Sequence, residues 1–191
     1  MALVGGSTSS APVVPLTTGR GTNIAARWSP DGTRLLYQHT SPWDSADLYV
    51  LEARPRAEPE RLTDSMPPSV DKAALVEPRF VRYDAPDGAK VPAYLFVPKG
   101  VDRSRPGPAV VWVHGDGITQ NFDGWHTRRD YAVYYSFHQY LVERGYVVLS
   151  VDYRGSIGYG KAWREGDYRD LGGRDYEDIA AGVSYLKTLE V

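Results

Sequence analysis

The sequence predicts an α/β protein in which a parallel β-sheet with crossover helices follows a shorter segment of β-strands. The first seventy residues lack helical periodicity, whereas later residues alternate apolar strands with amphipathic helices. Pro67 and Pro68 separate these two patterns, because prolines cannot donate to a sheet ladder and restrict the residue before them. We therefore expect two parts, residues 1–68 and residues 69–191.

The first part carries a hairpin signal. Ser29-Pro30-Asp31-Gly32 lies between two apolar runs. Pro30 presets the backbone angle of the second turn position, and Gly32 tolerates a positive φ. A further strand is expected from Asp47 to Leu51.

A spaced dipeptide suggests a repeat. Leu16-Thr17 and Leu62-Thr63 occupy similar settings and lie about 46 residues apart. Because β-propeller blades repeat every 40 to 50 residues or so, the spacing predicts about one blade, the last of a propeller, within residues 1–68. The alternative interpretation is a chance dipeptide match beside a common hairpin.

The second part opens with two strands, Phe80 to Asp84 and Lys90 to Val97, around the turn Pro86-Asp87-Gly88. Ala109 to Val113 and Tyr146 to Val151 are continuous apolar runs, typical of parallel strands buried on both faces. A helix between the last two strands would make the crossover that a parallel pair requires.

Two helices are expected in this part. The first runs from Asp130 to Glu143 and ends at Gly145, which accepts the left-handed cap conformation. Its predicted core-facing residues are Val133, Phe137, Tyr140 and Leu141. His138 lies beside that face and is interpreted as a surface histidine. The second helix starts at Asp175 with an acidic first turn, and its apolar residues are Tyr176, Ile179, Ala180, Val183 and Leu186.

Composition excludes several function classes. The chain has 22 basic and 24 acidic side chains, so it offers no broad positive field for nucleic acid or a membrane surface. It has no cysteine, which rules out thiol nucleophiles and thiolate metal sites. It contains no leader pattern and no apolar run of about 18 residues. The default expectation is a cytoplasmic protein, with compartment and oligomeric state otherwise unknown.

A glycine-rich loop follows the strand that ends at Val113. Its residues are His114-Gly115-Asp116-Gly117, at the carboxyl end of a predicted central strand. Such a loop can present backbone amides to an anion, as the oxyanion loop of strand–helix hydrolases does. The alternative interpretation is a glycine turn that only connects two elements. On the first interpretation the amides of Gly115 and Asp116 are candidate oxyanion donors.

A second loop, residues 152–160, follows the next parallel strand and should border the same cleft. We expect His114, Gly117, Arg154 and Ser156 to line that cleft. Ser156 is not a nucleophile candidate, because Arg154 stands where Gly-x-Ser-x-Gly requires its first glycine. Arg154 itself is interpreted as a buried structural arginine. The glycine spacing matches neither a dinucleotide fingerprint nor a phosphate loop.

A metal site is the weaker interpretation of nearby polar residues. The candidates are His114, Asp116, Asp123 and His126. They lack the His-x-x-x-His spacing of helical zinc sites, so loop polarity is the simpler explanation.

These motifs, in this order, resemble one known family. Trp28-Ser29-Pro30-Asp31-Gly32 precedes Val113-His114-Gly115, then residues 152–160 read Asp-Tyr-Arg-Gly-Ser-Ile-Gly-Tyr-Gly, and residues 170–178 begin the last helix. The chain closely resembles the prolyl oligopeptidase family of serine peptidases along nearly all its length.

The resemblance implies a β-propeller stacked on an α/β-hydrolase domain, of which residues 69–191 would be the N-terminal part. It implies cleavage of peptide substrates by a Ser, Asp and His triad, without metal or cofactor. The family's motif order places the Gly-x-Ser-x-Gly elbow after the helix that ends near Leu189. On this expectation all three triad residues lie beyond Val191, and the chain alone should not catalyse.

One residue departs from the family pattern. Acylaminoacyl peptidases usually carry His-Gly-Gly-Pro where this chain has His114-Gly115-Asp116-Gly117. An inward carboxylate would oppose a developing oxyanion by about 4 kcal/mol at about 4 Å and an effective dielectric of about 20. Only the backbone amide of Asp116 is therefore carried over.

Other expectations remain open at this point. An esterase on the same fold would share the acyl-transfer chemistry, and a non-catalytic propeller or interaction module would need none. A chain that stops before the next strand would leave the Tyr146 to Val151 strand at an unpaired apolar edge. We expect such a chain to aggregate or to be partly ordered.

Overall fold

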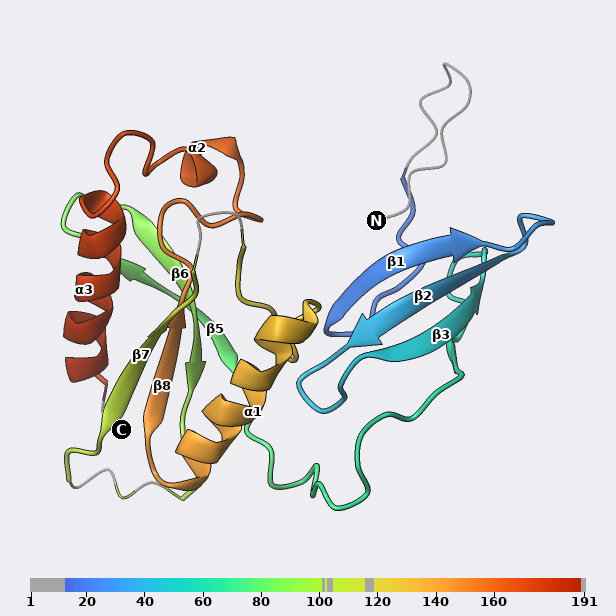
Figure 1. The fold of residues 1–191 in the computed structure, drawn as a ribbon, viewed down its shortest axis with the longest axis horizontal. Helices are drawn as coiled ribbons and strands as arrows, with labels where there is room; N and C mark the ends of the chain where they lie inside the picture. Colours follow the sequence, from blue (N-terminus) through green and yellow to red (C-terminus); the bar gives the residue numbers. More distant parts are fainter. Residues whose placement is uncertain (1–12, 101, 103–104, 116–118, 190–191) are drawn as a thin grey trace.

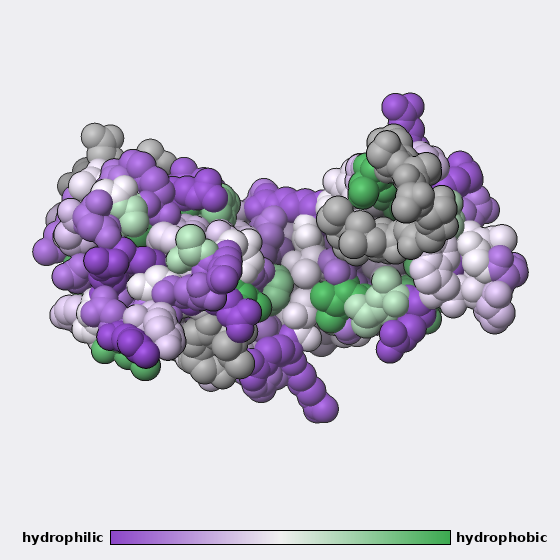
Figure 2. Space-filling view, turned by 90° about the horizontal axis from the view of Figure 1, so that it is seen from above, coloured by the Kyte–Doolittle hydropathy of each residue, from purple (hydrophilic) through white to green (hydrophobic). Residues whose placement is uncertain are grey.

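The computed structural model describes residues 13–100, 102, 105–115 and 119–189. They form two four-stranded β-sheets, and the helices pack on the second sheet (Figure 1). No helix within these ranges is long and apolar enough to cross a membrane. Seen from above, hydrophilic residues cover much of both halves of the molecule, and hydrophobic residues gather near its middle (Figure 2).

The first sheet is an antiparallel meander. Its strands are β1 (Thr22–Trp28), β2 (Arg34–Thr40), β3 (Asp47–Glu52) and β4 (Glu60–Arg61), in that order. The predicted hairpin is confirmed, because the turn at residues 29–32 joins β1 to β2 and Gly32 has a φ of +70°. The predicted strand from Asp47 is confirmed as β3.

The second sheet has the order β5-β6-β8-β7 and is mixed. Its strands are β5 (Arg79–Asp84), β6 (Lys90–Phe96), β7 (Ala109–Val113) and β8 (Val147–Val151). β7 and β8 run parallel, as predicted, while β5 and β6 form an antiparallel hairpin and β6 pairs antiparallel with β8. The two strands expected around the turn at residues 86–88 thus form a hairpin, which makes the sheet mixed beyond its parallel pair.

The expectation that β8 would lie at a sheet edge is wrong. β8 pairs with β6 on one side and with β7 on the other, and all five of its residues are buried. The outer strands among the described residues are β5 and β7. A continuous apolar run therefore identified a central strand but not its neighbours.

The helices cover opposite faces of this sheet (Figure 1). They are α1 (Arg129–Glu143), α2 (Lys161–Arg164) and α3 (Arg174–Lys187). Leu149 and Val151 of β8 pack with Ile179 of α3. Val148, on the other face of β8, packs with Val142 of α1. The alternation along β8 therefore separates two cores, one beneath each long helix.

Of the four residues of α1 predicted to face the core, Leu141 packs against it and the other three are exposed. Val133, Phe137 and Tyr140 are 60%, 45% and 48% exposed. His138, interpreted from the sequence as a surface residue, is 4% exposed and lies edge-on to the rings of Phe96 and Trp112. The residues of α1 that are buried are Tyr135, His138 and Val142.

The two sheets meet through side chains that are distant in sequence. The Tyr135 hydroxyl on α1 donates to the Pro42 carbonyl oxygen at 3.0 Å. Arg20 Nε donates to Asp123 Oδ2 at 2.5 Å, across 103 residues of sequence. The loop after β2 therefore lies against α1 and the segment that precedes it.

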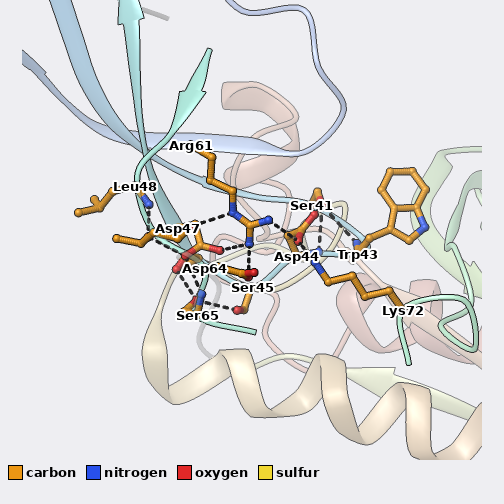
Figure 3. A network of polar contacts seen from close by, with 12 residues as sticks. Ser41, Trp43, Asp44, Ser45, Asp47, Leu48, Arg61, Asp64, Ser65 and Lys72 are labelled. Carbon is orange, nitrogen blue, oxygen red and sulfur yellow. Dashed lines mark hydrogen bonds and ion pairs between the residues drawn. The ribbon is translucent and has the colours of Figure 1, made fainter. Parts of the chain in front are cut away.

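Beside this junction, Arg61 organises a cluster of carboxylates (Figure 3). Its guanidinium contacts Asp47 at 2.5 Å, Asp64 at 2.7 Å and Asp44 at 3.3 Å. Asp44 also pairs with Lys72 at 2.5 Å, in the segment that leads to β5. The cluster thus ties the end of the first sheet to the connection between the two parts.

Candidate functional site

Two loops meet at one edge of the second sheet. β7 ends at Val113 and β8 ends at Val151, and these two residues are paired in the parallel register. The loops that follow them therefore leave the sheet side by side, at the carboxyl edge where sites on open sheets gather. The first begins at His114 and the second at Asp152.

The His114 side chain joins the two loops. It is 2% exposed, and its Nε2 atom lies 2.9 Å from Ser156 Oγ and 3.3 Å from Asp152 Oδ1. Its ring stacks on Tyr153 with 4.7 Å between centroids, and the Tyr153 hydroxyl donates to the His114 carbonyl oxygen at 2.9 Å. The first residue of the glycine-rich loop is thereby fixed by the loop after β8.

His114, Ser156 and Asp152 share the composition of a catalytic triad but not its geometry. In a triad the serine contacts Nε2 and the carboxylate contacts Nδ1. Here both groups contact Nε2, while Nδ1 lies 3.1 Å from the Gly115 carbonyl oxygen. Ser156 is also 0% exposed. The cluster can position a loop, but it cannot present Ser156 to a substrate.

The glycine-rich loop is described only in part. Gly115 is exposed, and its amide donates to the Tyr131 hydroxyl on α1 at 3.1 Å. A second acceptor would have to share this N–H. Asp116 and Gly117, also singled out from the sequence, lie outside the described residues.

Known proteins resemble parts of this chain. The model of the prolyl oligopeptidase family matches residues 133–191. Dipeptidyl-peptidase 5 of Schizosaccharomyces pombe is 33% identical over 100 residues, which cover 52% of this chain and 14% of that protein. Over these residues the chain is similar to the prolyl oligopeptidase family.

Other known proteins are similar along more of the chain. The uncharacterized peptidase YuxL of Bacillus subtilis is 27% identical over 155 residues, covering 81% of this chain and 22% of its own length. The structure of a Mycobacterium tuberculosis puromycin-hydrolyzing peptidase superposes with a TM-score of 0.71 at 29% identity, covering 82% of this chain and 23% of that one. This chain therefore spans about a fifth of these relatives.

Arg154 is buried and paired with carboxylates on two other elements. It is 6% exposed and donates to Asp178 on α3 at 2.7 and 2.9 Å, and to Asp87 at 2.5 Å. The hydrogen bonds that Arg154 donates to Asp178 hold the pKa of Arg154 above its ordinary value. The interpretation as a buried structural arginine is confirmed. His114, Arg154 and Ser156 are buried, so their side chains do not line an open cleft.

Three of the four residues weighed as metal ligands, His114, Asp123 and His126, have protein partners, and the fourth, Asp116, lies outside the described residues. His126 lies 3.1 Å from the Gln120 carbonyl oxygen and accepts from the Arg128 amide at 2.9 Å. Burial lowers the pKa of His126. Asp123 pairs with Arg20. Within the described ranges, no group of three histidine, aspartate or glutamate side chains is arranged to hold a metal ion.

Sequence reasoning missed three polar residues of this site. Asp152 was seen only as the start of a motif, and Asn121 and Tyr159 were not singled out. The Tyr159 hydroxyl donates to Asp152 Oδ2 at 2.5 Å, and burial together with the Asp152 charge raises the pKa of Tyr159. A polar residue directly after a buried strand was the available signal for Asp152. The sequence held no signal for Asn121, because its contacts with Asp152 form only when the loop folds back against the end of β8.

Proposed function

We propose that the whole protein is a serine peptidase that cleaves peptide bonds by acyl transfer to a serine. The observation that carries the proposal is the pair of hydrogen-bonded loops at the carboxyl ends of β7 and β8, in a chain similar to the prolyl oligopeptidase family. Relatives are named as dipeptidyl peptidases and as a puromycin-hydrolyzing peptidase, which supports short peptides and aminoacyl amides as substrates.

In this proposal residues 1–68 form the last blade of a β-propeller, and residues 69–191 form the N-terminal part of an α/β-hydrolase domain. The antiparallel meander β1–β4 supports the first assignment, and the β7-α1-β8 crossover supports the second. The sequence of residues 1–191 contains no Gly-x-Ser-x-Gly motif, so we place the nucleophile outside these residues.

The chemical contribution of this chain would be stabilisation of negative charge. Attack of a serine oxygen on the scissile carbonyl carbon converts the carbonyl oxygen into an oxyanion. Backbone N–H groups already aimed at that position lower the barrier without reorganising. We assign the amide of Asp116 to this role, with the amide of Gly115 as a second donor that exchanges its bond to the Tyr131 hydroxyl.

Assays of the whole protein on dipeptide p-nitroanilides and on p-nitrophenyl esters would test the proposal. We expect hydrolysis of the anilides, inhibition by a serine-directed organophosphonate, and no turnover by residues 1–191 alone. Turnover of esters alone would favour an esterase. A folded whole protein that hydrolyses neither substrate class would reject the proposal and favour a non-catalytic interaction module.

A further inference from the structure

One carboxylate holds both described ends of the glycine-rich loop. Asp152 Oδ1 accepts from the Asn121 backbone amide at 2.7 Å and from Asn121 Nδ2 at 2.9 Å. The same oxygen lies 3.3 Å from His114 Nε2. His114 is the first residue of the glycine-rich loop, and Asn121 lies just after the loop. The Asp152 side chain therefore contacts residues at both ends of the loop.

The rest of the second loop reinforces this closure. The Ile157 amide donates to the Thr119 carbonyl oxygen at 3.1 Å, and Ser156 contacts His114. Asn121 Nδ2 also donates to the Val151 carbonyl oxygen at 3.0 Å, immediately before Asp152. His114, Thr119 and Asn121 are therefore each anchored to the strand end or the loop of β8.

Burying a carboxylate costs free energy unless it accepts hydrogen bonds, and the Asp152 carboxylate accepts several. It is 0% exposed, and Tyr159 donates to its second oxygen. An ionised carboxylate in such a place needs several donors, and its charge-assisted hydrogen bonds are about twice as strong as neutral ones. A neutral amide of the same shape would keep one acceptor oxygen and replace the other with a donor.

We propose that Asp152 is a positioning residue that holds His114 and Asn121, the two described ends of the oxyanion loop, next to each other. This inference rests on the proposed function. Oxyanion stabilisation depends on donors that are held in place before the reaction, and an error of about 1 Å in such a site can reduce the rate about a hundredfold. Asp152 touches the ends of the loop and leaves the reacting atoms to the backbone amides.

The test compares Asp152→Asn, Asp152→Ala and Tyr159→Phe in the whole protein. Asp84→Asn is the matched control, because Asp84 is 63% exposed and paired with the similarly exposed Lys90. With a dipeptide p-nitroanilide we expect kcat to fall about tenfold for Asp152→Asn and about a hundredfold for Asp152→Ala, with KM within about threefold. Tyr159→Phe should lie between wild type and Asp152→Asn, and the control should match wild type.

A second readout separates positioning from general structural damage. A peptide aldehyde forms a tetrahedral adduct with a serine nucleophile, whereas the corresponding peptide alcohol binds without forming one. We expect the affinity of the aldehyde to fall in parallel with kcat/KM through the variant series, while the affinity of the alcohol stays constant. Circular dichroism and thermal melting would confirm that each variant is folded.

The outcomes are distinguishable. A wild-type protein without hydrolase activity overturns the proposed function and this inference with it. An active wild type whose Asp152→Asn variant keeps its kcat and its aldehyde affinity overturns this inference alone, as does equal loss of aldehyde and alcohol binding. If both Asp152 variants are recovered unfolded, Tyr159→Phe decides the matter, and an unchanged kcat would count against the proposal.

Discussion

Gly124 lies against the peptide bond between Ser41 and Pro42, with no space for a side chain between the two segments. A Cβ atom built on Gly124 would stand 2.3 Å from both the carbonyl carbon and the carbonyl oxygen of Ser41. Gly124 also has a φ of +122°, which side-chain-bearing residues rarely adopt. This contact brings the segment before α1 against the loop after β2, so the close approach of these two segments requires glycine at position 124.

Gly124→Ala should destabilise the protein, because the new methyl group must push two backbone segments apart and adopt a strained φ. We expect a loss of about 2 to 3 kcal/mol in the free energy of unfolding, measured by urea denaturation. Gly19→Ala is the control, since its Cβ would meet nothing within 4 Å among the described residues. Equal stability of the two variants would show that the segments around Gly124 and Ser41 can move apart without loss of stability.

Arg154→Ala should lower the free energy of unfolding more than replacement of an exposed arginine by alanine. Removing the guanidinium leaves the buried Asp178 carboxylate without its charged partner, and breaking a buried pair typically costs about 3 to 5 kcal/mol. Arg54→Ala offers the matched control, because Arg54 and its partner Glu52 are 66% and 61% exposed. We expect the control to change stability by less than about 0.5 kcal/mol. Comparable losses in both variants would contradict a special role for the buried pair.

The sequence predicted the strands and helices well because their signals are local. β7 and β8 are short apolar runs bounded by glycine, proline and polar residues, and the structure places them within one residue of the predicted bounds. The order of the strands in the sheet, by contrast, has no local signal. β6 enters the sheet beside β8, and nothing in either segment encodes that pairing. Neighbours in a sheet are set by the whole chain.

The orientation of α1 shows where periodicity fails. Aromatic and aliphatic residues occur around much of this helix, so more than one stripe at helical spacing can be drawn. The stripe through Phe137 places the neighbouring His138 on the surface, yet its ring lies edge-on to both Phe96 and Trp112. The shape of the facing sheet selected the buried stripe, and that shape comes from β6 and β7 together.

Gly182→Ala tests how closely α3 approaches the sheet. In an exposed helix this change stabilises by about 1 kcal/mol. Here a Cβ would stand 2.9 Å from the Tyr83 hydroxyl oxygen and 3.1 Å from Leu149 Cδ2, so we expect a net loss of about 1 to 2 kcal/mol in urea denaturation. Ser184→Ala on the exposed face of the same helix should be neutral or slightly stabilising. A gain in stability for Gly182→Ala would mean that α3 can move away from β8.

His138 should make the protein sensitive to acid in a defined pH range. Burial lowers the pKa of His138 to about 4, whereas an unfolded histidine titrates near 6.5. Between these values the unfolded state binds a proton that the folded state does not, so stability is complete above about pH 6.5 and falls as the pH drops to about 4. The contribution is on the order of 3 kcal/mol over that range.

His138→Phe isolates this effect from the other titrating groups. Phenylalanine keeps the ring between Phe96 and Trp112, and His138 Nε2 has no hydrogen-bond partner within the described part of the chain, so no bond at that atom is lost. Urea denaturation at pH 7 and at pH 4.5 would measure both proteins. We expect the variant to lose less stability than wild type between the two conditions, because only wild type must keep a neutral imidazole buried against protonation. Identical pH dependence would mean that His138 is hydrated or already protonated in the folded protein.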